Sequence, residues 1–169
     1  MSKQLTNSDR GFTIVELVVA LLIIGIIASL SAPSLISIHR RNQIDTNLAE
    51  LLGAIKETQR QAMRLGRICR IDINPNTNLV TGNPPRCLPE TTNIDDEINI
   101  RTNLPGSNPN ISFSPKGNTT RMGTIVLSSN STDYQRCFVI SLGLGIMRTG
   151  EYRSSANSVS ARNCLAPSS

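Results

Sequence analysis

The chain has 169 residues, enough for one modest globular domain and one long additional element. Its 17 Lys and Arg against 12 Asp and Glu give a formal net charge of +5, which is compatible with an anionic partner but does not identify one. A single histidine excludes a multi-histidine metal site, and the shortage of aromatic residues disfavours base stacking on single-stranded nucleic acid.

The N-terminus combines a short polar head, residues 1–11, with a long apolar segment. From Phe12 to Ile38 the only charge is that of Glu16. About 20 apolar residues in a helix are enough to cross a bilayer, so a transmembrane helix is predicted over residues 12–39. An ordinary secretory signal has its small-residue cleavage site after the apolar stretch. Here the natural cleavage point is Gly11–Phe12, before it, which would leave the apolar segment in the mature protein.

This segment resembles the class III signal of type IV prepilins, on the string GFTIVELVVALLIIGIIASLSAPSL. The matching positions are Gly11 before the cut, Phe12 after it, Glu16 and, deeper in the helix, Pro33. The resemblance implies that a prepilin peptidase removes the leader, residues 1–11, on the cytoplasmic side and methylates the new amine of Phe12. A simple signal anchor is the alternative.

Glu16 is a carboxylate within an apolar helix, which costs about 2.5–3.5 kcal/mol at the bilayer centre and less near an interface. Its natural partner is the amine of Phe12, either its own or that of a neighbouring subunit. The resemblance implies the neighbour, with Glu16 and Phe12 acting in filament assembly. The alternative is a carboxyl group that is protonated at the membrane surface.

The orientation in the membrane follows from the cysteines, because Lys3 and Arg10 before the segment balance Arg40 and Arg41 after it. Four cysteines after the apolar segment suit two disulfides in an oxidising compartment, so the second half is expected in the periplasm. A zinc site is the rival interpretation, and no CxxC pair supports it. Three pairings are open, and the one favoured here joins Cys69 to Cys87 and Cys137 to Cys164.

Residues 40–66 are predicted to continue the helix as an amphipathic segment that ends at Gly66. Its apolar residues recur at helical spacing, which indicates a face packed on the protein's own sheet; a coiled-coil stalk is the alternative. Bends are expected at Pro33 and Gly25.

After Gly66 the pattern changes to short alternating segments separated by Gly, Asn and Pro turns. They predict an antiparallel β head over residues 67–152, with strands at 68–73, 78–82, 98–102, 111–115, 124–129, 135–142 and 145–152 and loops at 83–92 and 104–110. Residues 153–169 are predicted to be a tail, tethered by Cys164. The fold class is therefore α+β, with a long N-terminal helix packed on an antiparallel sheet.

The second half also resembles the C-terminal part of the GspH/FimT family of minor pilins and pseudopilins. The resemblance rests on turn glycines and strand positions, namely Phe113, Pro115, Gly117, Ile125, Leu127, Val139, Ser141, Gly143, Gly145 and Arg148.

The sequence contains no recognisable catalytic set, so an enzyme is not predicted and no cofactor or metal is expected. His39 is isolated beside the apolar segment and supports no Ser-His-Asp arrangement. Asp95, Asp96 and Glu97 form an acidic cluster that is interpreted as a solvated loop, with a calcium site as the alternative.

A DNA contact is the main alternative function. Arg121, Arg136, Arg148 and Arg153 lie in the last third, where Asp133 and Glu151 are the only acids, and arginines on one face could contact phosphates. Some FimT-like minor pilins bind DNA through a Gly-Arg-x-Arg stretch. The corresponding residues here begin at Gly145 and have Ile146 at the first basic position, so that motif is half present.

These patterns predict a minor pilin or pseudopilin, a structural subunit assembled at or near the tip of a type IV pilus or type II secretion pseudopilus. Its expected partners are other pilin or pseudopilin subunits, the prepilin peptidase and the bacterial inner membrane, which it crosses once. The alternative is a pilus-associated DNA receptor for natural transformation.

Overall fold

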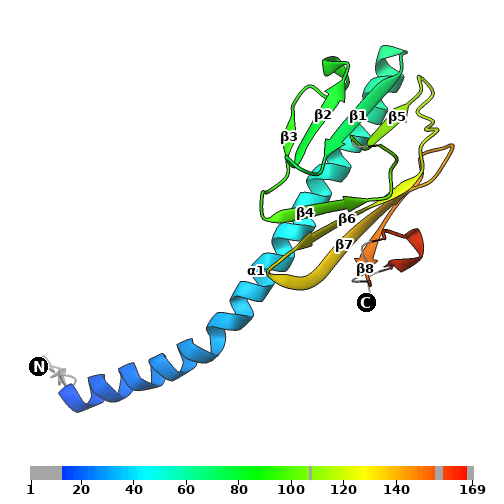
Figure 1. The fold of residues 1–169 in the computed structure, drawn as a ribbon. Coiled ribbons are helices and arrows are strands. Elements are labelled where there is room, and N and C mark those ends of the chain that lie inside the picture. The colour runs from blue at the N-terminus through cyan, green and yellow to red at the C-terminus, as the bar shows by residue number, and fades with distance from the viewer. Residues whose placement is uncertain (1–12, 107, 155–157, 167–169) are drawn as a thin grey trace, which may run out of the picture. The chain divides into compact units, whose positions relative to one another are not determined.

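The computed structural model describes residues 13–106, 108–154 and 158–166, without the side chains of residues 28–35. The chain divides into two compact units, residues 1–38 and residues 39–169. Helix α1 (Ile14–Leu65) contributes to both (Figure 1).

In the first unit, α1 is assigned without interruption across Gly25 and Pro33. A side chain added at Gly25 would meet open space. The side chain of Pro33 lies outside the described residues, and bending at these two positions stays a prediction.

In the second unit, α1 buries one face and exposes the other. The buried residues recur at helical spacing: Ile44, Leu48, Leu51, Ile55, Thr58 and Ala62. The helix ends at Leu65, as predicted, and Gly66 follows with φ +60°, the left-handed conformation that favours glycine. Across this glycine the Arg67 N–H donates to the Ala62 carbonyl, so a freed carbonyl of the last turn is satisfied.

Over the described residues, the strands form two antiparallel sheets. The first has the order β3-β2-β1-β5, from β1 (Cys69–Asn74), β2 (Leu79–Asn83), β3 (Thr92–Asn93) and β5 (Asn110–Phe113). The second has the order β4-β6-β7-β8-β9, from β4 (Ile98–Thr102), β6 (Gly123–Ser129), β7 (Thr132–Ile140), β8 (Met147–Tyr152) and β9 (Cys164–Leu165). Figure 1 shows both sheets beside the second half of α1.

The second sheet is buried on both faces because its strands alternate between two apolar clusters. Ile125, Leu127 and Phe138 belong to the main core, which also holds the buried face of α1. On the other face, Val126, Cys137, Val139, Tyr152 and Cys164 form a smaller cluster with Val159 and Ala161 packed against it. The C-terminal segment therefore closes the outer face of this sheet.

The α+β fold class is confirmed, and the details differ at short elements. The 3-10 helix Pro85–Cys87 lies in the region expected to be loop, and strand β3 begins at its last residue, Thr92. Strand β7 starts at Thr132 rather than 135. Residues 153–169 are more than a tail, because they contribute the 3-10 helix Ala161–Asn163 and β9. The sequence predicted a single antiparallel β head and left its strand order open. In the structure, the strands of the head form two sheets.

Two glycines provide a matched test of this packing. Gly150 faces β9, where an added Cβ would overlap the Leu165 carbonyl. We expect Gly150→Ala to lower the free energy of unfolding by about 1–3 kcal/mol through overpacking. Gly53, on the exposed face of α1, has open space around it, so Gly53→Ala should raise stability by about 0.5–1 kcal/mol. Thermal unfolding of the detergent-solubilised chain measures both, and an unchanged midpoint for Gly150→Ala would contradict the close β8–β9 packing.

Candidate assembly surfaces

The described chain begins with a helix cap made by Thr13 and Glu16. The Glu16 N–H donates to Thr13 Oγ1 at 3.3 Å, and the Thr13 N–H donates to Glu16 Oε2 at 3.5 Å. This reciprocal pair is a capping box, and the sequence carries its Thr-x-x-Glu signature at residues 13–16. Gly11 and Phe12 lie outside the described residues, so cleavage and the pairing of Glu16 with the Phe12 amine stay predictions.

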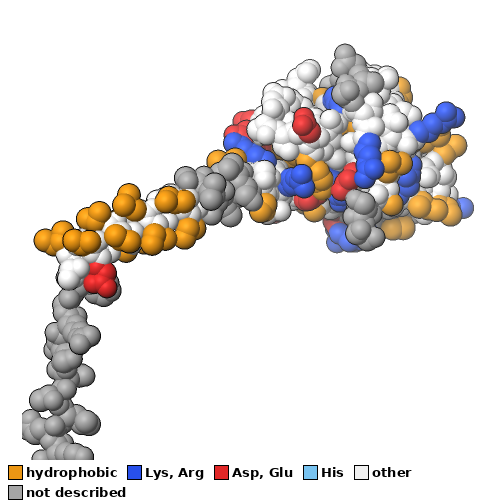
Figure 2. Space-filling model, turned by 90° about the horizontal axis from the view of Figure 1, so that it is seen from below, with side chains coloured by type: hydrophobic (Ala, Val, Ile, Leu, Met, Phe, Trp, Pro, Cys, Tyr) orange, Lys and Arg blue, Asp and Glu red, His pale blue; other side chains and the backbone are white. Residues whose placement is uncertain are grey.

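After the cap, α1 presents apolar side chains around its whole circumference. Their exposed fractions run from 48% for Val18 to 82% for Ile14, and the other members are Val15, Leu17, Val19, Leu21, Leu22, Ile23, Ile24, Ile26 and Ile27. Figure 2 shows these side chains along the described part of the helix. So many exposed apolar side chains far exceed the scattered ones normal for a monomer surface, which marks this segment as a candidate contact surface.

Within the described part of the chain, no helix is both long enough and apolar enough to cross a membrane.

The cysteines form two disulfides, Cys69–Cys87 and Cys137–Cys164, with Cα–Cα distances of 5.4 and 5.8 Å. This is the pairing favoured from the sequence. The first ties β1 to the 3-10 helix after β2. The second ties the centre of β7 to β9, which holds the C-terminal segment on the second sheet.

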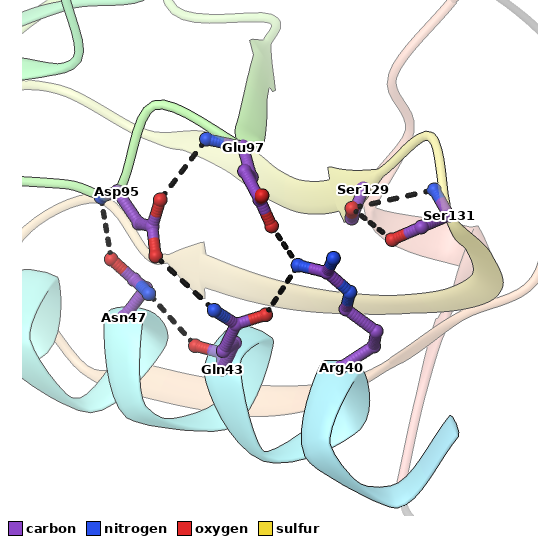
Figure 3. A network of polar contacts seen from close by, with 7 residues as sticks. All are labelled: Arg40, Gln43, Asn47, Asp95, Glu97, Ser129 and Ser131. Atoms are coloured by element: carbon purple, nitrogen blue, oxygen red, sulfur yellow. Dashed lines mark hydrogen bonds and ion pairs between the residues drawn. The ribbon is translucent and has the colours of Figure 1, made fainter. Parts of the chain in front are cut away.

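A polar network joins the start of the head's helix to the loop before β4 (Figure 3). Arg40 forms an ion pair with Glu97 and donates to Gln43 Oε1 at 3.0 Å. Asn47 Oδ1 accepts the Asp95 N–H at 2.9 Å, and Gln43 Nε2 lies 3.5 Å from Asp95 Oδ2. These contacts fix the loop to α1.

The acidic cluster is therefore partly engaged in structure. Glu97 faces Arg40, and Asp95 also accepts the Glu97 N–H at 3.1 Å. Asp96, between them, is exposed. Among the described residues, no group of three or more His, Cys, Asp or Glu side chains is arranged to hold a metal ion.

A second polar cluster joins α1 to β7. Arg136 Nε lies 2.8 Å from Asp45 Oδ1, and the Tyr134 hydroxyl is 3.4 Å from both carboxylate oxygens of Asp45. The Arg41 guanidinium lies 5.2 Å from the centre of the Tyr134 ring. Burial raises the pKa of Tyr134, so the hydroxyl stays protonated and can donate to Asp45. Arg136 is therefore engaged within the head.

Arg148 holds the C-terminal segment. Its Nη1 donates to the Cys164 carbonyl at 2.9 Å and its Nη2 to the Ala161 carbonyl at 2.8 Å. Arg153 also contributes, because its backbone N–H donates to the Asn163 carbonyl at 3.0 Å while its guanidinium lies 3.6 Å from Glu151.

The candidate DNA-binding arginines do not share one face. Arg136 lies two residues before Phe138 and so points to the α1 side of the second sheet, whereas Arg148 is paired with Val139 and lies on the opposite side. Arg121 is placed in the segment between β5 and β6. Sequence analysis missed the partners of Arg136 and Arg148 because both depend on contacts between distant segments.

Limited proteolysis can test whether the two hydrogen bonds of Arg148, called the clamp below, hold the C-terminal segment on the second sheet. Removing two charge-assisted hydrogen bonds should loosen residues 158–166 while the Cys137–Cys164 bond retains them. We expect Arg148→Ala to speed limited proteolysis in this segment severalfold, measured by mass spectrometry of the fragments. Arg162→Ala, an exposed arginine of the same segment, is the control. Equal cleavage rates for Arg148→Ala and the native chain would rule out the clamp.

Comparisons with known proteins agree with the two sequence resemblances. Residues 6–32 match the family model of the prokaryotic N-terminal methylation motif, and residues 47–144 match that of type II transport protein GspH. No curated protein matches the chain.

Comparison with solved structures gives one match with a similar fold and one weaker match. The type IV minor pilin FimU of Pseudomonas aeruginosa superposes with a TM-score of 0.56 at 14% identity, over 69% of this chain and 97% of that one. The minor pseudopilin EpsH from the type 2 secretion system of Vibrio cholerae has a TM-score of 0.46 at 13% identity, over 65% of this chain and 94% of that one. Because the GspH model matches more than half of the residues, the chain belongs to the family of type II transport protein GspH.

Proposed function

We propose that this chain is a minor pilin or pseudopilin, a membrane-anchored structural subunit that enters a type IV pilus or type II secretion pseudopilus at or near its tip. The observation that carries the proposal is the apolar surface of α1 over residues 14–27, which is exposed on every side. In a filament subunit, lipid would cover this surface before assembly. The apolar helices of other subunits would cover it after assembly.

The other parts support the same role. The match of residues 6–32 to the prokaryotic N-terminal methylation motif supports the proposed cut at Gly11–Phe12, directly before the apolar segment. Two disulfides suit a head in the periplasm. The proposed partners are accordingly the prepilin peptidase, the inner membrane and other pilin-like subunits, and the proposed role is structural rather than enzymatic.

The alternative of a DNA receptor stays a prediction and is favoured by no contact described above. Two of its four arginines, Arg136 and Arg148, are engaged within the head, and they lie on opposite faces of the second sheet.

The mature N-terminus tests the processing step. We expect the protein isolated from membranes to begin at a methylated Phe12, as shown by its intact mass and N-terminal sequence. Gly11→Val should block the cut, because a branched side chain replaces the smallest residue beside the scissile bond. A native protein that still begins at Met1, or one that lacks the apolar segment, would overturn the proposal.

Glu16→Gln tests the charge at the start of the helix. Glutamine can replace glutamate in a capping box, so the helix start is retained while the negative charge is lost. We expect membrane insertion to be unchanged and the amount of the chain in sheared filaments to fall at least fivefold.

The matched control is Thr13→Val, which removes the capping hydroxyl but keeps the carboxylate of Glu16. It should enter filaments far better than Glu16→Gln. Native incorporation of Glu16→Gln would exclude an assembly role for the charge.

A further inference from the structure

The outer face of the second sheet, the face turned away from α1, is only partly covered. The C-terminal segment packs Val159 and Ala161 against the smaller apolar cluster of this face. Beside Ala161 lies a hollow of about 280 Å³, called the outer hollow below. Its lining includes Asn103, Met122, Thr124, Val139, Leu142 and Ala161.

Most of the lining of the outer hollow is apolar. Val139 contributes from the sheet, and Met122 and Leu142 are 64% and 60% exposed. An apolar group that entered would therefore remove both exposed side chains from water. At about 30 Å³ for each non-hydrogen atom, the hollow has room for roughly nine of them. That is the size of one aromatic ring, or one short branched chain, with a small polar group attached.

One lining hydroxyl is buried and has no hydrogen-bond partner among the described residues. Thr124 is 0% exposed, and its Oγ1 is the unpartnered atom. The backbone of Thr124 is engaged, because its N–H donates to Asn103 Oδ1 at 2.7 Å and its carbonyl accepts the Asn103 N–H at 3.2 Å. A buried hydroxyl without a partner lowers stability, and an oxygen atom of a ligand in the hollow would supply that partner. Since Asn103 Oδ1 is occupied, its Nδ2 is the part of that side chain left for a ligand, and it is a donor.

The charges around the outer hollow are positive. Arg121 precedes Met122 along the chain, and Arg162 follows Ala161. Arg148 donates to the Ala161 carbonyl at 2.8 Å and to the Cys164 carbonyl at 2.9 Å. Both of these acceptors are neutral, so the hydrogen bonds hold the guanidinium in place without cancelling its charge.

Acidic side chains lie elsewhere. Between residues 98 and 169 the sequence has two acids, Asp133 and Glu151. Glu151 is paired with Arg136 and shares its side of the sheet, the side of α1. Asp133 lies six residues along β7 from Val139, or about 20 Å at 3.3 Å per residue. The local field therefore favours an anion in the outer hollow over a cation.

We propose that the outer hollow binds a small organic acid, with an aromatic or branched apolar group against Val139, Met122 and Leu142 and a carboxylate that accepts from Thr124 Oγ1. The limited volume disfavours a long lipid chain, and the apolar lining disfavours the phosphates of DNA. This binding site goes beyond the proposed function, because a structural subunit requires no small ligand.

Methionine methyl groups can report occupancy of the hollow. The full chain, with isotope-labelled methionine methyl groups, is placed in lipid nanodiscs and titrated with phenylacetate. A bound ring should shift the NMR signal of Met122, assigned with Met122→Leu, in a saturable way. Met147 packs against the main core on the other side of the sheet, so its signal should stay in place.

Ligands of the same shape test the charge. Phenylacetamide is neutral and phenylethylammonium is cationic. We expect phenylacetamide to bind about fivefold more weakly than phenylacetate, because hydrogen bonds to an ionised acceptor are stronger. Phenylethylammonium should produce no saturable shift. Equal binding of all three ligands, or equal shifts at Met122 and Met147, would overturn the proposal.

Thr124→Val separates binding from stability. The substitution keeps the shape of the side chain and removes the unpartnered hydroxyl, so the unfolding midpoint of the free chain should rise by about 2–4 °C. Affinity for phenylacetate should fall about tenfold, because a hydrogen bond to the carboxylate is lost. Thr149→Val, on the other face of the same sheet, is the control and should leave the affinity within twofold of native. Native affinity in Thr124→Val would exclude the assigned hydroxyl contact.

Leu142→Asp gives an independent test at an exposed position, where a substitution changes stability little. It places a negative charge on the apolar wall and should abolish the saturable shift of Met122. Leu165→Asp alters an exposed leucine of β9 that does not line the hollow and should preserve binding. If Leu142→Asp binds phenylacetate as the native chain does, the site is not the outer hollow.

Discussion

The head depends on the burial of one face of α1 against two sheets. Each fully buried Leu or Ile contributes about 1.5–3 kcal/mol, and Ile44, Leu51 and Ile55 are completely buried in this face. The same helix continues toward the N-terminus with equally apolar residues, whose side chains over residues 14–27 are exposed in the described part of the chain. One helix thus has a buried face that the head covers and a segment whose apolar side chains stay exposed.

Charged side chains lie in different places on the covered and the exposed parts of α1. Where α1 is covered, charged side chains lie at the margins of the contact, as Arg40 does with Glu97 and Asp45 with Arg136. Where α1 is uncovered, the described charge is Glu16, at the first turn. Its carboxylate accepts the Thr13 N–H and so caps the helix, a structural role that is independent of the proposed one in assembly.

The sequence was most informative where structure is local. The end of α1 at Leu65 could be predicted because Gly66 provides the left-handed cap, and β4 was predicted at residues 98–102 because alternation is a property of the strand itself. Strands β3 and β9 could not be predicted, since two residues carry no period and become strands only through their partners. The division into two sheets could not be predicted either, because alternation identifies a strand's two faces but not its neighbouring strands. For the same reason Arg148 was interpreted as a surface cation, although its partners lie 13 and 16 residues further along the chain.

The tethered C-terminal segment has a consequence for how copies can meet. A bare outer strand offers unpaired N–H and C=O groups on which another chain can grow a sheet. Strand β9 occupies that position beside β8, and the buried Cys137–Cys164 bond prevents it from drifting away. At the other sheet, β3 presents two residues, too few to template further growth. At the β9 and β3 edges, the sheets therefore offer little free backbone on which another chain could add a strand.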